Sequence, residues 1–414
     1  MKNLCKIALR NLRRYTRRSL LTVSLIGFGV VFVLVFVAVT GSFKQLVIKQ
    51  ITESYLGDVQ IHRRGYVASI DSLPVNLNLT PTEVAAIDAA FAGDAEVQAY
   101  SRRIKFGGLF SNFVETTNIR INGVYPEQEF ATCPQLVTRI TQGQRDSTAL
   151  DKGKILVPAL LARGFGTQVG ETVVLVATNK DGSVNGKTFV VSGILESATG
   201  PGGRDGYIHF EDAMELLRMS EPEVSEMAVR IKTLGQVGRV AHSVRTRLAS
   251  TGTGQGAARL EVHTWDQLSP FANVARMIDV MIFFIKLMLI AIVLMSILNV
   301  MLMAVYERVR EIGTLAAIGT LPRKILALFL VEGFFLGVAG AVVGVLVGLG
   351  LIGILHLAKL SVAFGQGTYA LAPTIAPLEV LTASVLVIGV SLLASAQPAY
   401  KASRLEPIEA LRHV

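Results

Sequence analysis

The residues whose types and spacing indicate a binding surface gather in one short charged segment, residues 307–324, between two apolar runs. Acidic and basic side chains alternate at its start, apolar side chains follow at helical spacing, and a glycine and Pro322 end the pattern. This sequence predicts a short amphipathic helix that either lies on anionic headgroups as a connector or docks a partner protein. We favour docking. The candidate contact residues are Glu307, Arg308, Arg310, Glu311, Ile312, Gly313, Leu315, Ala317 and Gly319.

Catalytic chemistry is not expected from this sequence. Its two cysteines, Cys5 and Cys133, lack metal-binding spacing, and no nucleophile–base motif occurs. The glycines of residues 252–256 form a flexible loop rather than a phosphate-binding loop, because no Lys-Ser/Thr pair follows them. We therefore expect no enzyme activity, bound metal or cofactor in this chain. The histidines of the central region are scattered without ligand spacing: His62, His209, His242 and His263.

The composition points to a membrane protein. Of the 414 residues, 51% are hydrophobic and only 17% are charged, against about 25% charged in soluble domains. Four uncharged runs are each long enough for a helix to cross about 30 Å of hydrocarbon. The runs are residues 19–40, 287–306, 333–358 and 380–400. We predict spanning segments at residues 19–41, 276–306, 325–358 and 377–400.

The net charge of +9 predicts the topology when it is divided by segment. Residues 1–18, a basic amphipathic leader, carry +7, residues 307–324 carry +2 and residues 401–414 carry +1, whereas residues 42–275 carry −1. Lysine and arginine excess marks cytoplasmic flanks. Both termini and the 307–324 loop are therefore expected inside, and residues 42–275 and the loop 359–376 outside. This distribution argues against nucleic-acid binding, which requires a basic face.

Residues 42–275 are expected to fold as an α+β domain with two lobes. A capping-box pattern at Thr80–Glu83 begins a helix, and Asn179–Gly182 is a hairpin turn. The expected strands cover residues 59–63, 119–125, 173–176, 189–191 and 227–231, and further helices cover residues 211–217 and 236–248.

The helices that join this domain to the membrane are expected to continue outward as a stalk. The pattern from Ser269 to Glu307 would span roughly 57 Å as one helix, unless it breaks near Asp279. The apolar stalk faces either guide acyl chains or pack against each other. Their residues are Phe43, Val47, Ile51, Ile278, Ile282 and Ile285.

A glycine stripe marks the third spanning segment and covers an arc of roughly 80°. Small residues let helices approach closely in lipid. The stripe therefore packs within the subunit or forms a dimer seam, and both remain open here. Its residues are Gly333, Gly337, Gly340, Gly344 and Gly348.

Several motifs together resemble the type VII ABC transporter permeases, the superfamily of MacB, LolC/LolE and FtsX. The 307–319 segment is similar to that family's coupling helix, residues 398–412 to its closing motif, and residues 8–14 to its leader. Residues 57–62, 122–124 and 164–173 are similar to the MacB-like periplasmic core. The resemblance covers nearly the whole chain and is closest to LolC/LolE-like permeases.

The resemblance implies a one-plus-three arrangement of spanning helices in the bacterial inner membrane and a dimer with a second copy or a paralogue. It also implies a partner ATPase, and because the sequence contains no GxxxxGK[ST] motif we expect ATP and Mg²⁺ on a separate subunit. A periplasmic carrier or adaptor is a further expected partner. The leading function is lipoprotein or lipid release. The alternatives are MacB-like efflux and FtsX-like signalling to a cell-wall hydrolase.

Overall fold

The chain folds as two compact units, a helical unit and an α+β unit. The computed structural model describes residues 2–92, 94–196, 205–251, 259–358, 360–364 and 367–405. Residues 1–45, 275–362 and 368–414 belong to the helical unit, and residues 46–274 and 363–367 to the α+β unit. The glycine-rich loop expected at residues 252–256 lies outside the described residues, as does the tail from residue 406 onward.

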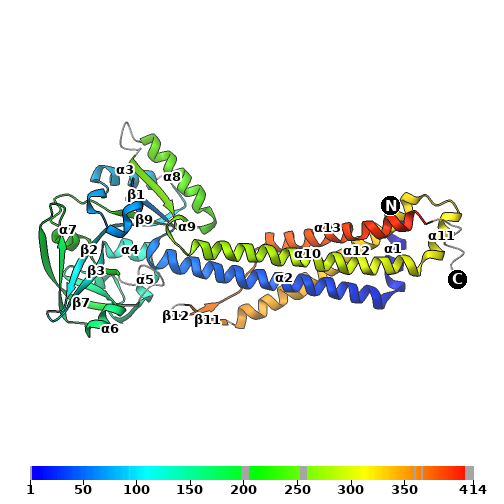
Figure 1. The fold of residues 1–414 in the computed structure, drawn as a ribbon, viewed down its shortest axis with the longest axis horizontal. Coiled ribbons are helices and arrows are strands. Elements are labelled where there is room, and N and C mark those ends of the chain that lie inside the picture. Colours follow the sequence, from blue (N-terminus) through cyan, green and yellow to red (C-terminus); the bar gives the residue numbers. More distant parts are fainter. Residues whose placement is uncertain are drawn as a thin grey trace. The chain divides into compact units, whose positions relative to one another are not determined.

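The long helices of the helical unit run side by side, and the short helices α1 and α11 lie at the same end of this unit (Figure 1). Within the described residues, four helices are long and apolar enough to cross a membrane, and each contains one of the predicted spanning segments. The helix α10 runs through Asp279 without a break, so the alternative of a break there is wrong. The helices are α1 (Lys2–Arg14), α2 (Thr16–Ile51, continued by the π-helical turn η1, Thr52–Leu56), α10 (Ala272–Glu307), α11 (Val309–Ala317), α12 (Pro322–Ala358) and α13 (Pro377–Ser403).

Between α12 and α13, where the sequence indicated only a loop, the chain forms a two-stranded sheet of β11 (Leu360–Phe364) and β12 (Gly367–Leu371). The interior of the helical unit is mostly apolar, and all four long helices bury side chains in it. Dispersion and close packing hold such helices together in lipid, where water supplies no hydrophobic drive. Representative core residues are Ile26, Val30, Leu34, Val293, Ile297, Phe329, Leu336 and Val387.

Among the described residues, one sheet of ten strands forms the centre of the α+β unit. The strand order is β10-β1-β9-β2-β3-β8-β5-β7-β4, with β6 paired to β2 and β7. The β3–β8 and β5–β7 pairs are parallel and the other pairs antiparallel. The strands are β1 (Val59–Arg63), β2 (Val97–Ser111), β3 (Thr116–Val124), β4 (Ile140–Gly143), β5 (Lys154–Pro158), β6 (Thr172–Thr178), β7 (Val184–Leu195), β8 (Asp205–His209), β9 (Glu226–Ile231) and β10 (Leu260–Thr264).

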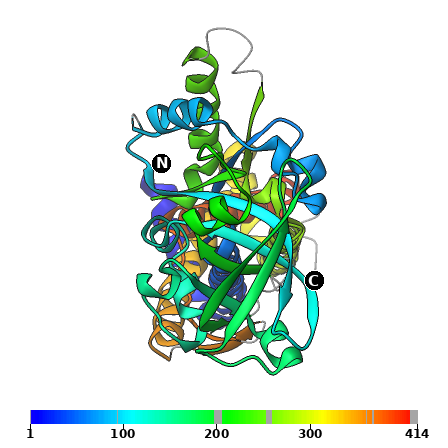
Figure 2. The same cartoon turned by 90° about the vertical axis from the view of Figure 1, so that its left-hand side faces the viewer.

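Figure 2 looks onto this unit and shows the strands curving across it, with α3 and α8 beside them. The capping box predicted at the start of α3 is confirmed: the Thr80 amide donates to Glu83 Oε2 at 2.8 Å, and the Glu83 amide donates to Thr80 Oγ1 at 3.4 Å. The strand predicted at residues 59–63 matches β1, and the predicted 179–182 turn joins β6 to β7. The helices are α3 (Pro81–Ala92), α4 (Pro126–Thr132), α5 (Gln135–Thr138), α6 (Ala159–Phe165), α7 (Phe210–Leu216), α8 (Val237–Thr251) and α9 (Trp265–Leu268).

Candidate functional site

The helix predicted in the charged segment is present as α11, and it has one buried and one exposed face. Ile312 is 3% exposed and Gly313 is also buried, which fixes this face against the helical unit. Glu311 and Leu315 lie at helical spacing on the opposite, exposed face, and Ile318 continues it with 78% of its surface exposed. Ile318 was not among the predicted residues, although its spacing of three from Leu315 marks the same face.

A glycine turn ends α11. Gly319 has a φ of +89°, which favours glycine because a side chain is strained there. The Gly319 amide donates to the Ala316 carbonyl at 3.0 Å, and the Thr320 amide donates to the Leu315 carbonyl at 3.0 Å. These two bonds form a Schellman cap and satisfy carbonyls that the end of the helix leaves free. The helix α12 then begins at Pro322, so α11 is a short rigid element with defined ends.

Ion pairs connect α11 and the residues before it to the N-terminal basic segment. Arg14 Nη1 lies 3.3 Å from Glu311 Oε1, and Arg18 Nη1 lies 2.7 Å from Glu307 Oε2. Both pairs are at least partly exposed, so each stabilises the arrangement by no more than about 1 kcal/mol. The sequence did not predict these contacts. The only hint was the excess of basic residues at the N-terminus opposite acids in the 307–324 segment.

Arg308, in contrast, is buried. It stands between α10 and α11, its side chain is 5% exposed, and its Nη1 lies 3.0 Å from Glu332 Oε1 on α12. Of the other predicted contact residues, Arg310 and Ala317 are exposed. The structure therefore divides the predicted set into exposed residues of α11, which form the predicted docking face, and buried residues, Arg308, Ile312 and Gly313, which we call the anchor.

The glycine stripe packs inside the chain. Gly333 and Gly337 face Ser395 and Ser391 of α13, whereas Gly340, Gly344 and Gly348 face Ile26, Val30 and Leu34 of α2. A side chain at most of these positions would collide with the neighbouring helix, because an added Cβ at Gly344 would lie 2.6 Å from Val30 Cβ. Of the two readings left open by the sequence, packing within the subunit is the one the structure bears out, and the stripe is not available as a dimer seam.

The predicted stalk faces are largely covered. Val47, Ile51 and Ile278 are 2%, 3% and 5% exposed, respectively. Phe43, Ile282 and Ile285 are half-buried, and the last two pack against the apolar core of the helical unit. Packing therefore explains the apolar character of Ile282 and Ile285. Contact of these faces with acyl chains stays a prediction.

The α+β unit contains a buried charge network. Arg103 is 1% exposed and pairs with Glu129 at 2.7 Å and with Glu226 at 2.9 Å, and Lys105 pairs with Glu226 at 2.9 Å. Burial alone would raise the pKa of Glu226, but Lys105 and Arg103 outweigh it and hold this pKa well below its usual range. Cys133, fully buried beside Arg103, has a pKa raised to about 12 by burial, so it is an unreactive thiol.

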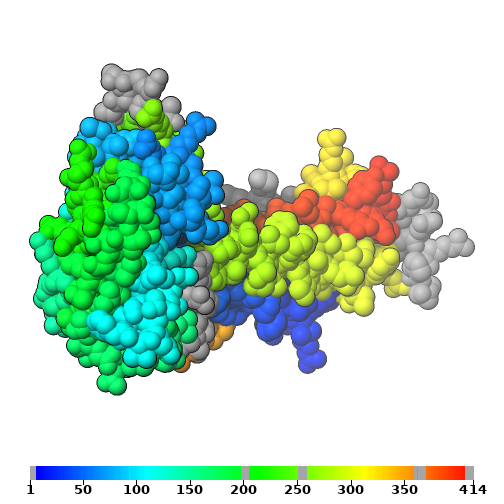
Figure 3. Space-filling model, turned by 60° about the vertical axis from the view of Figure 1, so that its left-hand side comes forward, coloured from blue at the N-terminus to red at the C-terminus, as the bar shows by residue number. Residues whose placement is uncertain are grey.

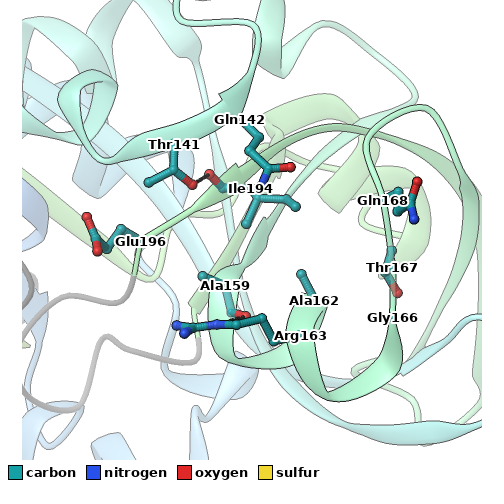
Figure 4. Close-up of a pocket in the computed structure, with 10 residues that line it drawn as sticks. All are labelled: Thr141, Gln142, Ala159, Ala162, Arg163, Gly166, Thr167, Gln168, Ile194 and Glu196. Atoms are coloured by element: carbon teal, nitrogen blue, oxygen red, sulfur yellow. Dashed lines mark hydrogen bonds between the residues drawn. The ribbon is translucent and has the colours of Figure 1, made fainter.

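An open pocket of about 510 Å³ lies between α6 and the β4–β7 edge of the sheet (Figure 4). Its polar side chains do not converge as a catalytic group: Arg163 Nε donates to the carbonyl of Ala159 in its own helix, and Thr141 Oγ1 donates to the carbonyl of Ile194. In the described part of the chain, no three His, Cys, Asp or Glu side chains are grouped to hold a metal ion. The α11 end of the helical unit thus remains the candidate site.

Comparisons with known proteins identify the family. The sequence model described as "MacB-like periplasmic core domain" matches residues 19–247, and the one described as "FtsX-like permease C-terminal" matches residues 282–407. The first match includes most of the α+β unit, and the second includes the segment that contains α11 and α12.

Curated relatives of two kinds match. A lipoprotein-releasing system transmembrane protein LolC of Xylella fastidiosa is 24% identical over 309 residues, covering 71% of this chain and 72% of that protein. A macrolide export ATP-binding/permease protein MacB of Syntrophobacter fumaroxidans is 40% identical over 119 residues. A pyoverdine export ATP-binding/permease protein PvdT of Pseudomonas savastanoi is 40% identical over 116 residues. The last two matches cover 28% of this chain and only 15% and 16% of those proteins.

Among solved structures, the periplasmic region of MacB from Actinobacillus actinomycetemcomitans aligns with 53% of this chain, at 11% identity and a TM-score of 0.37. The first family match covers more than half of the chain, and the second covers residues 282–407, which include α11, α12 and α13. The chain therefore belongs to the type VII ABC transporter permeases, the superfamily that includes MacB, LolC and FtsX.

Proposed function

We propose that the chain is a permease subunit that couples ATP hydrolysis by a separate ATPase subunit to the release of lipoprotein or lipid from the outer leaflet of the bacterial inner membrane. In this arrangement both termini and α11 face the cytoplasm, and the α+β unit lies in the periplasm. The observation that carries the coupling role is α11, a short capped helix with an anchored face and an exposed face.

Dimerisation of the ATPase subunits around ATP would displace α11, and the attached helices would carry this displacement outward. The helix α10 is suited to this task because it runs 36 residues, about 54 Å, without a break. No pore is needed, since a moving periplasmic domain lifts cargo from the membrane surface. ATP and Mg²⁺ are held by the ATPase subunit in this proposal.

The LolC relative favours lipoprotein as the cargo, because its match extends over most of both chains. MacB-like efflux is a second candidate, favoured by the higher identity of the shorter MacB and PvdT matches. Signalling to a cell-wall hydrolase is less favoured, because the matched periplasmic domain is of the MacB type.

We further propose that two permease chains, identical or paralogous, assemble through α10. The glycine stripe is covered within the chain, whereas α10 lies at the surface of the helical unit in the view of Figure 3. Met281, Phe284 and Met288 lie at helical spacing on α10 and are 42%, 59% and 57% exposed. Methionine side chains adapt to irregular surfaces and suit such a contact.

The cargo is tested by co-reconstitution of the permease and its ATPase in proteoliposomes that contain an acylated lipoprotein. We expect ATP-dependent release of the acylated protein and no release of the same protein without its acyl chains. Equal release of the protein with and without its acyl chains would exclude the lipoprotein proposal. ATP-driven export of a macrolide or siderophore instead of lipoprotein release would also exclude it and favour efflux.

The coupling role is tested with Glu311→Ala, which removes an exposed side chain from the docking face. We expect about tenfold weaker coupling of ATP turnover to release if Glu311 is one of the few residues that carry most of the binding energy of the contact. The control is Leu346→Ala, an exposed apolar position on α12. Equal coupling in both variants would remove α11 as the docking element.

A further inference from the structure

Glu332 is an acidic residue in an apolar part of α12. Its side chain is 2% exposed, and Phe329 and Leu336, one turn away on either side, are 1% and 3% exposed. The residue also lies within a helix apolar enough to cross a membrane. A buried carboxylate in such surroundings is unfavourable unless charged or polar groups compensate it.

Two donors from distant parts of the sequence compensate it, and both bind the same oxygen. Asn11 Nδ2 of α1 donates to Glu332 Oε1 at 2.7 Å, and Arg308 Nη1 donates to it at 3.0 Å. Asn11 is 321 positions away in the sequence and Arg308 is 24. One carboxylate therefore joins α1, the start of α11 and α12.

An aromatic ring holds the other side of Arg308. The guanidinium carbon lies 4.6 Å from the centroid of the Tyr15 ring, within the range of a cation–π contact. Tyr15 connects α1 to α2, so Arg308 is enclosed between α12 and the N-terminal elements. The exposed Arg14–Glu311 and Arg18–Glu307 pairs surround this centre but are screened by solvent.

This geometry limits how α11 can move. A displacement of α11 alone would separate Arg308 from Glu332 and leave a charge buried without its partner, which is strongly unfavourable. A displacement that carries α1 and α12 along keeps the pair intact. The buried pair therefore favours joint movement of the three elements.

We propose that Glu332 is the positioning residue through which a displacement of α11 reaches α1 and α12. The inference rests on the proposed function, in which an ATPase moves α11. It assigns a role to a residue that does not contact the ATPase, ATP or cargo: Glu332 acts through Arg308, and Asn11 extends the connection to the N-terminal helix.

The test compares Glu332→Gln with a matched control, Glu379→Gln. Glu379 also pairs with a lysine of another helix, Lys286, at 2.7 Å, but it begins α13 and is 42% exposed. In the full permease reconstituted with its ATPase, we expect Glu332→Gln to lower cargo release per ATP hydrolysed about tenfold while ATP turnover stays within about twofold. The control should keep the wild-type ratio.

Variants that restore the ion pair distinguish a positioning role of Glu332 from a merely structural one. Glu332→Asp keeps the charge and should recover part of the release ratio. The exchanged pair, Glu332→Arg with Arg308→Glu, recreates the ion pair, and the Asn11 amide oxygen then accepts from the new arginine. We expect this double variant to release more cargo per ATP hydrolysed than Glu332→Arg alone or Arg308→Glu alone. Equal ratios in wild type and Glu332→Gln, or equal losses in Glu332→Gln and the control, would overturn the proposal.

A second measurement needs neither ATPase nor cargo. Spin labels at Ile318→Cys, directly after α11, and at Phe334→Cys on α12 report the distance between the end of α11 and α12 in nanodiscs, and both positions are exposed. We expect a narrow distance distribution in the otherwise wild-type chain and a broadened one with Glu332→Gln, but not with Glu379→Gln. If the wild-type complex shows no ATP-driven release, the proposed function fails. The distance measurement still tests whether Glu332 connects α11 to α12, because an unchanged distance distribution in Glu332→Gln would refute that connection.

Discussion

Replacement of a single glycine in α12 tests the packing of the helical unit. In Gly344→Ala, the added Cβ would lie 2.6 Å from Val30 Cβ and 2.8 Å from the carbonyl oxygen of Gly27, both on α2. Carbon atoms pack best at about 3.5–4.0 Å, so α2 must shift by about 1 Å. The Gly27 oxygen belongs to the backbone and cannot be moved by rotating a side chain.

The magnitude follows from two opposing effects. Overpacking of a close-packed interior costs about 1–3 kcal/mol, and the backbone contact places this site in the upper half of that range. Alanine regains about 1 kcal/mol because it is a better helix former than glycine. We therefore expect Gly344→Ala to lower the free energy of unfolding by about 1–2 kcal/mol.

The same helix contains the controls. An added Cβ at Gly353 would have no atom within 4 Å, so Gly353→Ala should leave stability unchanged or raise it by up to about 1 kcal/mol. At Gly348 the nearest atom is Cδ1 of Leu34, 3.1 Å away on a flexible side chain, so the loss there should be intermediate. The free energy of unfolding is measured by SDS titration of the full chain in mixed micelles. A Gly344→Ala variant as stable as Gly353→Ala would refute the packing assigned to the stripe.

Four further predictions concern the other parts of the chain. Arg103→Met should lower the free energy of unfolding by roughly 3–5 kcal/mol, measured by denaturant titration, because it removes the ion-pair partner of the buried Glu129 and one of the two partners of Glu226. Since the pKa of Glu226 is lower in the folded state than in the unfolded state, its stabilisation is fully present above the unfolded pKa of about 4.3 and declines as the pH falls from there through the folded-state pKa, which a pH series of melting temperatures checks. Gly319→Ala should destabilise the end of α11 by about 1 kcal/mol, visible as faster amide exchange there. Met288→Cys should form a disulfide-linked dimer on oxidation in membranes, whereas Leu346→Cys should not.

Periodicity and charge predicted the elements whose determinants are local. The apolar runs lie within the four long helices, the Thr80 capping box begins α3, and the pattern ending at Gly319 is α11. Each depends on residues a few positions apart, so the sequence carries the information directly. The glycine stripe is an intermediate case, because its spacing showed a close contact but not which helix makes it.

The contacts that organise the candidate site were not predictable in this way. The hydrogen bond from Asn11 to Glu332 joins residues 321 positions apart, and no periodic pattern connects them. The sequence analysis counted Arg308 among the docking residues, although the structure buries it in the anchor. The buried pairing of Arg103 was likewise missed, because a charged residue in a strand reads locally as solvent-exposed.

The burial of Arg308 and Glu332 is hard to explain by stability alone. Among the ion pairs of the helical unit's described residues, the Lys44–Asp279, Lys286–Glu379, Arg14–Glu311 and Arg18–Glu307 pairs all keep partial exposure, and only Arg308–Glu332 is buried on both sides. A well-packed apolar pair at such a site is often as stable as an ion pair or more so. An apolar pair, however, tolerates sliding, whereas a hydrogen-bonded ion pair resists separation and fixes one arrangement. A helix that must transmit displacement needs a contact that resists separation, and an apolar contact that only fills space does not supply it. This difference is the physical basis for assigning Glu332 to coupling.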